Sequence, residues 1–458
     1  MTDKKSKIQS KLDKIKNPAK RQKVESRLLK GEGLTDSGES DASESESVLT
    51  DVLKSVSQLF DQAAKTDDPE QRRRLKEEAL ELLQRHEEPC EPEAPTPDTY
   101  PAPVPRTGQT TCWDSHYQEV DCDSCDAAPG QDGAVPAGVP WPEPRFKDNC
   151  DGTVTDGCTG LIWLKDADSF GEVTWDQARM LAAKLQGGCY GLTDGSRLRD
   201  WRLPTIRELF SIVDYGQAAP IVPADYPARE TVKPAIYWTS TTLLADPTQA
   251  WMMTLGIGPT VFMLKNSPNR MWPVRDGKFT IVPKSGQTQT FGFEKTGQDG
   301  LAENRTGVKW PERRFESDAN GIGTVTDNLT GLVWLQNANA FGWQTWEQAL
   351  LKCNSLHSGS IERLNDGSKQ GQWRLPNVRE IESLVDYGRA GPCLPDGWRE
   401  AFRPDQDSPP SVQPSSYWTS TTVAGAPSEA MFIILGIGPV IFENKEHPFF
   451  VWPVRNQI

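Results

Sequence analysis

The sequence predicts an α+β protein with two tandem copies of one domain, each built from a mainly antiparallel sheet and two helices. The first observation is an internal repeat with a period of about 170 residues. The second is the layout of each copy, in which short β-branched and aromatic segments alternate with two segments that begin as helices do. The third is that all 16 Trp residues lie at or after Trp113, so a long Trp-free leader precedes an aromatic-rich part.

The repeat consists of ordered motifs that return with little change. They are Trp141-Pro142 and Trp310-Pro311, Gly152–Asp156 and Gly323–Asp327, Thr159–Leu164 and Thr330–Leu335, Trp201–Pro204 and Trp373–Pro376, Tyr237–Thr242 and Tyr417–Thr422, and Trp272–Arg275 and Trp452–Arg455. The spacing between matching motifs grows along the copies, so the insertions fall in loops. Twelve Trp residues recur as six pairs, which we expect in the core, whereas four have no counterpart: Trp113, Trp251, Trp343 and Trp398.

The first half of each copy is predicted to hold a hairpin and both helices. Gly-Thr-Val-Thr-Asp and Thr-Gly-Leu-Ile/Val-Trp form the hairpin. The first helix follows a capping box, Thr174 with Gln177 or Thr345 with Gln348. Trp-Arg-Leu-Pro is predicted as a strand that runs into the second helix. That helix has caps of its own and is expected to end at a glycine; these residues are Thr205, Glu208 and Gly216, or Asn377, Glu380 and Gly388.

The second half of each copy is predicted to be β-structure. A short strand at Tyr237–Ser240 follows a long loop, and a hairpin pairs Ala250–Leu255 with Thr260–Lys265. Trp-Pro-Val-Arg forms the last strand. Two helices and several short strands joined by long loops indicate an α+β domain.

Three segments precede the repeat. Residues 1–47 are Lys-rich and then rich in Ser, Asp and Glu, which predicts disorder because little apolar surface offsets chain entropy; an interfacial helix near Ile8–Ile15 is the alternative. Residues 49–87 carry two apolar stripes separated at Asp68-Pro69, which predict a helix pair for self-association or partner docking, or a helical spacer. Residues 88–106 contain seven Pro and predict a stiff linker.

Composition argues against several function classes. A formal net charge of -14 is unsuited to general nucleic-acid binding, which needs a basic surface. No stretch approaches the roughly 18 apolar residues of a transmembrane helix, and the N-terminus lacks the apolar region of a secretory signal. These observations leave the compartment open between the cytoplasm and export by another route. With four His in the chain, a His-rich metal centre is not expected.

The ordered motifs resemble the C-terminal domain family of Legionella collagen-like proteins (Lcl_C). The resemblance rests on Asp-Gly-Thr-Val-Thr-Asp, Thr-Gly-Leu-Ile-Trp, Asp-Trp-Arg-Leu-Pro-Thr, Tyr-Trp-Thr-Ser-Thr-Thr and Trp-Pro-Val-Arg. It covers residues 107–276 and 290–456, with a linker at 277–289. The resemblance implies a C-type-lectin-like fold in each copy, and the named member of the family implies adhesion to sulfated glycans.

Metal chemistry is not expected. Lectin-like domains often hold calcium through Glu-Pro-Asn and Trp-Asn-Asp triplets, and neither occurs in the matching region. Asp148–Asp156 is similar to a calcium loop, but Lys147 and Cys158 stand where ligands are required, so we interpret the segment as a hairpin turn. We therefore predict neither a metal nor a cofactor.

Cysteines cluster in the first copy. Cys112 with Cys122, and Cys150 with Cys158, are spaced so that each pair could close a short loop as a disulfide. Cys122 and Cys125 form a lone C-x-x-C pair, which is a weak zinc signal. Disulfides would indicate export, whereas the lack of a signal peptide argues against it.

Charged positions recur in both copies and could be mistaken for a catalytic set. They are Arg202, Arg207, Glu208 and Asp214, and Arg374, Arg379, Glu380 and Asp386. No nucleophile or His accompanies them, so we assign them to helix capping and ion pairing. An enzyme similar to the formylglycine-generating relatives of the fold would need a reactive Cys pair late in a copy, where none stands. We predict a protein that is not an enzyme.

Differences between the copies, in the region before Trp-Pro-Val-Arg, indicate where a ligand binds. The candidate residues are Trp251, Met252, Asn266, Asn269 and Arg270 in the first copy, and Met431, Phe432, Asn444, His447 and Phe449 in the second. Their aromatic and Met content suits a protein ligand at least as well as a glycan. The leading hypothesis is a non-enzymatic binding protein with two lectin-like modules. The alternative is a structural or assembly component whose modules pack on each other or within a larger complex.

Overall fold

The computed structural model describes Gln71 and residues 100–457, except 125, 293–295, 302–306, 319–320 and 404–407. The predictions for residues 1–47, 49–87 and 88–99 lie outside this part. The chain divides into two compact units, Met1–Glu93 and Ala94–Ile458, and the second unit holds both copies of the repeat. We call residues 141–276 module one and 310–456 module two. The segments before them, 100–140 and 277–309, are the first and second approach segments.

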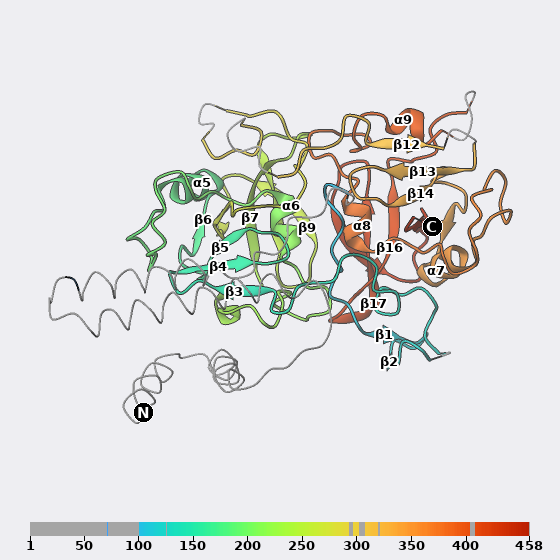
Figure 1. The fold of residues 1–458 in the computed structure, drawn as a ribbon, viewed down its shortest axis with the longest axis horizontal. Coiled ribbons are helices and arrows are strands. Elements are labelled where there is room, and N and C mark those ends of the chain that lie inside the picture. The colour runs from blue at the N-terminus through green and yellow to red at the C-terminus, as the bar shows by residue number, and fades with distance from the viewer. Residues whose placement is uncertain are drawn as a thin grey trace. The chain divides into compact units, whose positions relative to one another are not determined.

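Module one contains two sheets (Figure 1). The four-stranded sheet has the order β11-β5-β4-β3, with bounds Val274–Arg275, Ile162–Leu164, Thr153–Asp156 and Phe146–Asp148. The five-stranded sheet has the order β6-β10-β7-β8-β9, with bounds Glu172–Val173, Asn269–Arg270, Ile236–Thr242, Gln249–Thr254 and Thr260–Leu264. Pairing is antiparallel except between β10 and β7, so the predicted, mainly antiparallel arrangement is confirmed.

Module two repeats this topology. Its four-stranded sheet has the order β12-β13-β14-β20, with bounds Phe315–Ser317, Thr324–Asp327, Val333–Leu335 and Val454–Arg455. Its five-stranded sheet has the order β15-β19-β16-β17-β18, with bounds Trp343–Gln344, Phe449–Phe450, Ser416–Val423, Ala426–Ile434 and Val440–Asn444. The predicted hairpin before Trp-Pro-Val-Arg is therefore present in both modules, as β8–β9 and β17–β18.

Both predicted helices occur in each module. The first is α5 (Trp175–Lys184) or α7 (Trp346–Ser355), and the second is α6 (Ile206–Ser211) or α8 (Val378–Glu382). All four begin at the predicted capping boxes. A 3₁₀ turn at Arg229–Thr231 and the short α9 (Trp398–Ala401) lie in the long loops.

Two local predictions are wrong. Trp-Arg-Leu-Pro is not a strand: only Arg202 and Arg374 form isolated bridges, because the following Pro lacks an N–H and the next residue already caps a helix. The second helix stops well before the glycine expected to end it. A Cβ on Gly216 would lie 2.4 Å from the carbonyl oxygen of Gly108, and one on Gly388 equally close to that of Gly286. Each glycine therefore allows the close passage of an approach segment rather than ending a helix.

Tryptophan fills the cores as predicted. Ten of the twelve recurring Trp residues are buried, and Trp163 packs on Trp272 as Trp334 packs on Trp452, with ring centroids 5.0 Å apart in both modules. A buried ion pair also recurs: Arg145 binds both carboxylate oxygens of Asp156, and Arg314 binds those of Asp327, at 3.0 and 2.9 Å in each case. The two modules thus share one core in detail.

Each approach segment precedes one module in the chain but forms hydrogen bonds with the other module. In the first, Gln109 exchanges two hydrogen bonds with the backbone of Thr422, at 2.8 and 3.0 Å, and Asp132 accepts one from Thr421 at 2.6 Å. In the second, Gln287 and Asp299 make the same bonds to Thr242 and Thr241 of module one. Figure 1 accordingly shows β1 (Cys112–Trp113) and β2 (Glu119–Val120), in cyan, on the side of module two. The two modules are interlocked by this exchange.

Candidate ligand-binding surfaces

Four of the predicted ligand residues lie in the boundary between the modules or in its supporting core. Trp251, Met252, Met431 and Phe432 are all buried. The Trp251 ring lies 5.2 Å from that of Tyr387 in module two, and a Cβ on Gly258 of module one would touch Met431 at 3.0 Å. None of these side chains offers free surface to a ligand. Trp251 and Met431 are covered by the other module, whereas Met252 and Phe432 are buried under the first helix of their own module.

The hairpins are joined at their outer strands. The backbone N–H of Val440 on β18 donates to the Thr260 hydroxyl on β9 at 2.7 Å. Thr260 is fully buried, so this bond is shielded from water. The contact adds a polar bond to the apolar packing of the two hairpins.

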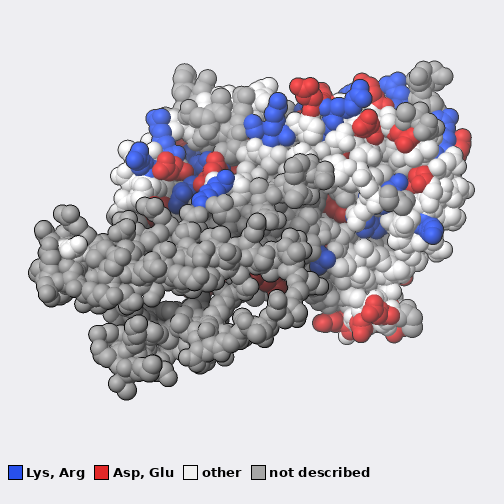
Figure 2. All heavy atoms as spheres, in the orientation of Figure 1, with Lys and Arg blue, Asp and Glu red and all other residues white. Residues whose placement is uncertain are grey.

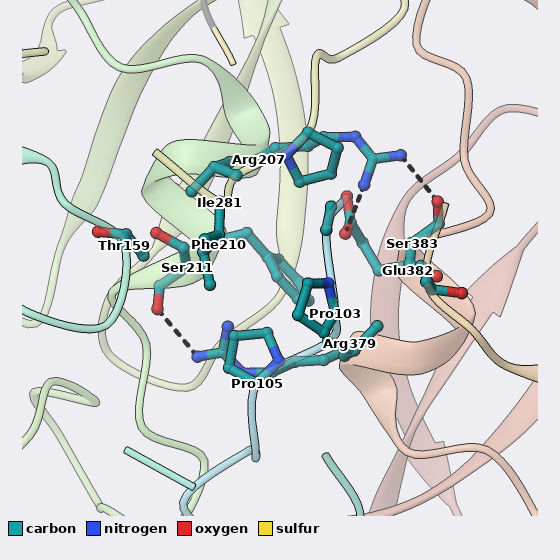
Figure 3. A pocket seen from close by; sticks show the side chains of 15 residues that line it. Pro103, Pro105, Thr159, Arg207, Phe210, Ser211, Ile281, Arg379, Glu382 and Ser383 are labelled. Atoms are coloured by element: carbon teal, nitrogen blue, oxygen red, sulfur yellow. Dashed lines mark hydrogen bonds and ion pairs between the residues drawn. The ribbon is translucent and has the colours of Figure 1, made fainter. Parts of the chain in front are cut away.

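Two arginines cross the boundary in opposite directions (Figure 3). Arg207 of α6 donates to Glu382 at 3.3 Å and to the carbonyl oxygens of Ser383 and Val385. Arg379 of α8 donates to the carbonyl oxygens of Ser211 and Val213 at 3.0 and 2.5 Å. These recurring arginines therefore join the modules.

The crossing is not symmetric in charge. Arg207 has the carboxylate of Glu382, whereas the counterpart of Glu382 in module one is Phe210, whose ring lies 5.9 Å from the Arg379 guanidinium. Burial and the nearby Arg145 lower the pKa of Arg379. The cavity beside these residues measures about 50 Å³, room for a few waters, whereas small-molecule sites are commonly about 300 Å³ or larger.

The recurring Arg–Glu pairs beside the second helix form the predicted ion pairs and caps. Arg202 binds both oxygens of Glu208 at 2.6 and 2.7 Å, and Glu208 also accepts the N–H of its cap residue Thr205. Arg374 and Glu380 repeat the pair in module two. Within the described residues, no group of three or more His, Cys, Asp or Glu is arranged to hold a metal ion.

The cysteines differ in state. Cys112 and Cys122 are joined by a disulfide, with Cα atoms 5.1 Å apart. Cys150 and Cys158 are free thiols, one exposed and one buried, and burial with the nearby Asp156 raises the pKa of Cys158 to about 11. Cys125 lies outside the described residues, so the structure does not test the predicted C-x-x-C pair.

An exposed aromatic edge lies on module two. Trp343 on β15 is 57% exposed, and its ring packs against Phe450 of β19 with centroids 5.6 Å apart. Phe449 lies on the same strand and stacks with His447 at 4.8 Å. The predicted residues Asn444, His447 and Phe449 therefore lie near one another, with Asn444 and His447 exposed. We call Trp343, His447, Phe449 and Phe450 the aromatic edge. Trp343 and Phe450 lie on one face of the β15–β19 pair, and His447 and Phe449 lie on the other.

The same edge of module one is charged. Glu172 pairs with Arg270 in the register in which Trp343 pairs with Phe450. Arg270 forms an ion pair with Asp168, and Asn269 is nearly buried. The backbone is held alike in both modules, since Trp238 donates to Val173 and Trp418 to Gln344 at 2.9 and 3.0 Å. The two modules therefore share the backbone of this edge and differ in its side chains.

Module one instead has an open polar depression of about 390 Å³. It is lined by Thr174, Asp176, Thr248, Leu264, Lys265 and Asn266. The Lys265 ammonium lies 3.9 Å from the Trp175 ring centre and donates to Thr242 at 3.0 Å. Burial and the neighbouring Arg179 lower the pKa of Lys265 to about 8. Of the predicted ligand residues, only Asn266 lies here.

Sequence reasoning missed Trp343 and Lys265 as site residues. Trp343 had a usable signal: it has no counterpart among the recurring Trp residues, and Glu172 stands at its position in module one. Lys265 recurs as Lys445, so nothing in its sequence distinguishes it, and its difference in exposure comes from a distant segment. Trp251 also lacks a counterpart, but its partner is the other module.

Comparison with known proteins agrees with the geometry of the modules. Residues 152–275 and 323–455 each match the Lcl C-terminal domain (Lcl_C), and the matches together span more than half of the chain. No curated protein matches the chain. Among the described residues, no helix is both long and apolar enough to cross a membrane. The chain therefore belongs to the Lcl_C family and carries two of its domains in tandem.

Proposed function

We propose that this chain is a non-enzymatic binding protein whose modules are C-type-lectin-like and whose aromatic edge recognises a glycan or a protein ligand. The observation that carries the proposal is the exposure of Trp343 beside Phe450. Tryptophan is enriched among the residues that dominate binding energy, and a flat aromatic face suits a sugar ring as well as an apolar side chain. Most other Trp residues in the described part are buried, so this exposure is a local feature of module two.

The binding test uses matched positions in the two modules. A glycan array is probed with the full chain, with Trp343→Ala and with Glu172→Ala, the same edge of module one. We expect Trp343→Ala to lower the signal at least tenfold and Glu172→Ala to leave it unchanged. A protein ligand is sought in parallel with a photo-reactive residue at His447, with one at the counterpart Ser267 as control. If Trp343→Ala binds both glycans and protein as the parent chain does, the proposal is overturned.

A structural role is the second candidate, and the boundary between the modules favours it. The central hairpins of the two modules pack apolar side chains against each other, as expected of modules that act as one rigid component of an assembly. In that case the aromatic edge would be covered by a fixed neighbour in a larger assembly. Acrylamide quenching of the parent chain and of Trp343→Phe distinguishes the two, because the difference between them reports the Trp343 fluorescence. In a structural role this fluorescence would already be protected in the native assembly, rather than only after ligand is added.

A further inference from the structure

The depression of module one has an occupied counterpart in module two. Its lining residues Thr174, Asp176, Thr248, Lys265 and Asn266 correspond to Thr345, Glu347, Ser428, Lys445 and Glu446. The backbone around both sites is held in the same way. The backbone N–H of Trp175 donates to the Lys265 carbonyl oxygen at 3.0 Å, and that of Trp346 donates to the Lys445 carbonyl oxygen at 2.9 Å. Each lysine then lies over the ring of that Trp, at 3.9 and 3.8 Å.

The occupant in module two is the β1–β2 hairpin, residues 112–122, closed by the Cys112–Cys122 disulfide. Its Trp113 and Tyr117 rings lie 5.7 and 5.9 Å from the Lys445 ammonium. The Tyr117 hydroxyl lies 3.5 Å from Glu446, and burial with the charges of Glu446 and Glu347 raises the pKa of Tyr117. Lys445 is left 5% exposed.

The matching stretch of the second approach segment is shorter in sequence. Gln131 bonds both backbone groups of Trp113, and Gln298 does the same for Phe291, so these residues mark equivalent ends. The chain between these ends is more than twice as long in the first segment as in the second. Residues 293–295 of the shorter stretch lie outside the described part, and the residues that the structure describes leave Lys265 more exposed than Lys445.

Charge favours the same kind of occupant in module one. The hairpin is acidic, with Asp114, Glu119 and Asp121, and Figure 2 shows acidic side chains gathered where Figure 1 places β1 and β2. In module one Asn266 replaces Glu446, and Arg179 replaces the apolar Leu350 under the Trp. The depression is therefore less acidic than its counterpart, which already accepts an acidic hairpin.

We propose that the module-one depression is the docking site for an acidic loop of a partner protein, which would place a Tyr or Trp side chain over Lys265 as the chain's own hairpin does over Lys445. The proposal rests on the proposed function only in that the chain binds a partner. Its site lies on the other module from the aromatic edge. Backbone framing, aromatic packing on a cation and the acidic loop all have their counterparts in module two.

The test uses a disulfide-closed synthetic peptide with the sequence of residues 112–122, titrated into the full chain by calorimetry. Since the chain's own hairpin covers Lys445, the open site is that of Lys265. We expect saturable one-to-one binding that falls at least tenfold with Lys265→Gln. A peptide with Trp113→Ala and Tyr117→Ala should lose binding to the same extent. Lys184→Ala, which removes a lysine at the far end of α5, should bind as the parent chain does.

A second variant guards against a folding defect. Asn266 is exposed, so Asn266→Trp should leave the fold intact while filling the depression, and we expect the same loss of peptide binding. Absence of peptide binding, or binding unchanged by both Lys265→Gln and Asn266→Trp, would overturn the inference, as would a glycan that alone binds in a Lys265-dependent way. Trp343→Ala should not alter peptide binding, so a failure of the aromatic edge is distinguishable from a failure of this site.

Discussion

The two modules share a core but differ in what they expose. Their Trp pairs and buried Arg–Asp pairs recur in detail, whereas the same sheet edge is aromatic in module two and charged in module one. The lysine over the first-helix Trp is covered in module two and open in module one. The two copies thus keep the residues that fold the domain and differ in the side chains that they expose.

The largest expected effect comes from the boundary where the two copies meet. Trp251→Ala removes a buried ring that packs on Tyr387 of the other module, and we expect the free energy of unfolding to fall by about 3–5 kcal/mol. Met431→Ala, at the matching position, should cost about 2–5 kcal/mol. Urea unfolding measures both. A loss below about 1 kcal/mol for Trp251→Ala would show that the boundary is not a packed core.

Substitution of the two crossing arginines should lower the free energy of unfolding by different amounts. Arg207→Met leaves Glu382 buried beside Tyr387 without its cation, which we expect to cost about 3 kcal/mol or more. Arg379→Met removes donors from neutral carbonyl oxygens only, and it also removes a poorly compensated charge, so about 1–3 kcal/mol is expected. The comparison uses denaturant unfolding of both variants. Equal losses would mean that Glu382 is not what distinguishes the two sides.

The covered and open lysines predict a difference in pH dependence. Burial lowers the pKa of Lys445 to about 7 and that of Lys265 to about 8. Both values lie below the ordinary lysine pKa of about 10.4. Between each lowered pKa and about 10.4 the unfolded chain binds more protons than the folded chain, so the free energy of unfolding rises with pH. Lys445→Met should flatten this rise from about pH 7 upwards. Lys265→Met should flatten it less and only from about pH 8, because Lys265 is more exposed.

Unfolding free energies of the parent chain and both lysine variants, measured from pH 7 to pH 10, test this expectation. Parallel curves for the parent and Lys445→Met would show that the hairpin does not bury the ammonium. A larger flattening in Lys265→Met than in Lys445→Met would reverse the assignment of covered and open sites.

The smallest effect on stability is expected at the aromatic edge. Trp343→Glu gives module two the residue that module one carries at this position, and because the side chain is mostly exposed we expect a change within about 0.5 kcal/mol. Thermal unfolding measures the change. A much larger loss, of the size typical of a buried side chain, would mean that Trp343 supports the fold, which would remove the main argument for a ligand there.

Local features were predictable and contacts between distant segments were not. The capping boxes at Thr174 and Asn377 depend on residues three apart, and both helices begin there. The recurring Trp residues were expected in the core because a repeat preserves what the domain needs to fold. Trp251 was expected at a ligand, because a residue without a counterpart looks the same whether it contacts a ligand or the other copy. The covering of Lys445 by a hairpin that lies far earlier in the chain has no local signal.

The exchange of approach segments also determines where force enters the folded unit. Tyr100, at the start of the first segment, lies against Gly331 of module two, and its hydroxyl accepts a hydrogen bond from Gln457 at the other end of the described chain. Ala102 donates to Leu329 in the same module at 3.0 Å. A load applied between residues 100 and 457 is therefore taken up first within module two. Module one lies in the chain between these two contact points, so we expect it to carry tension only after those contacts break.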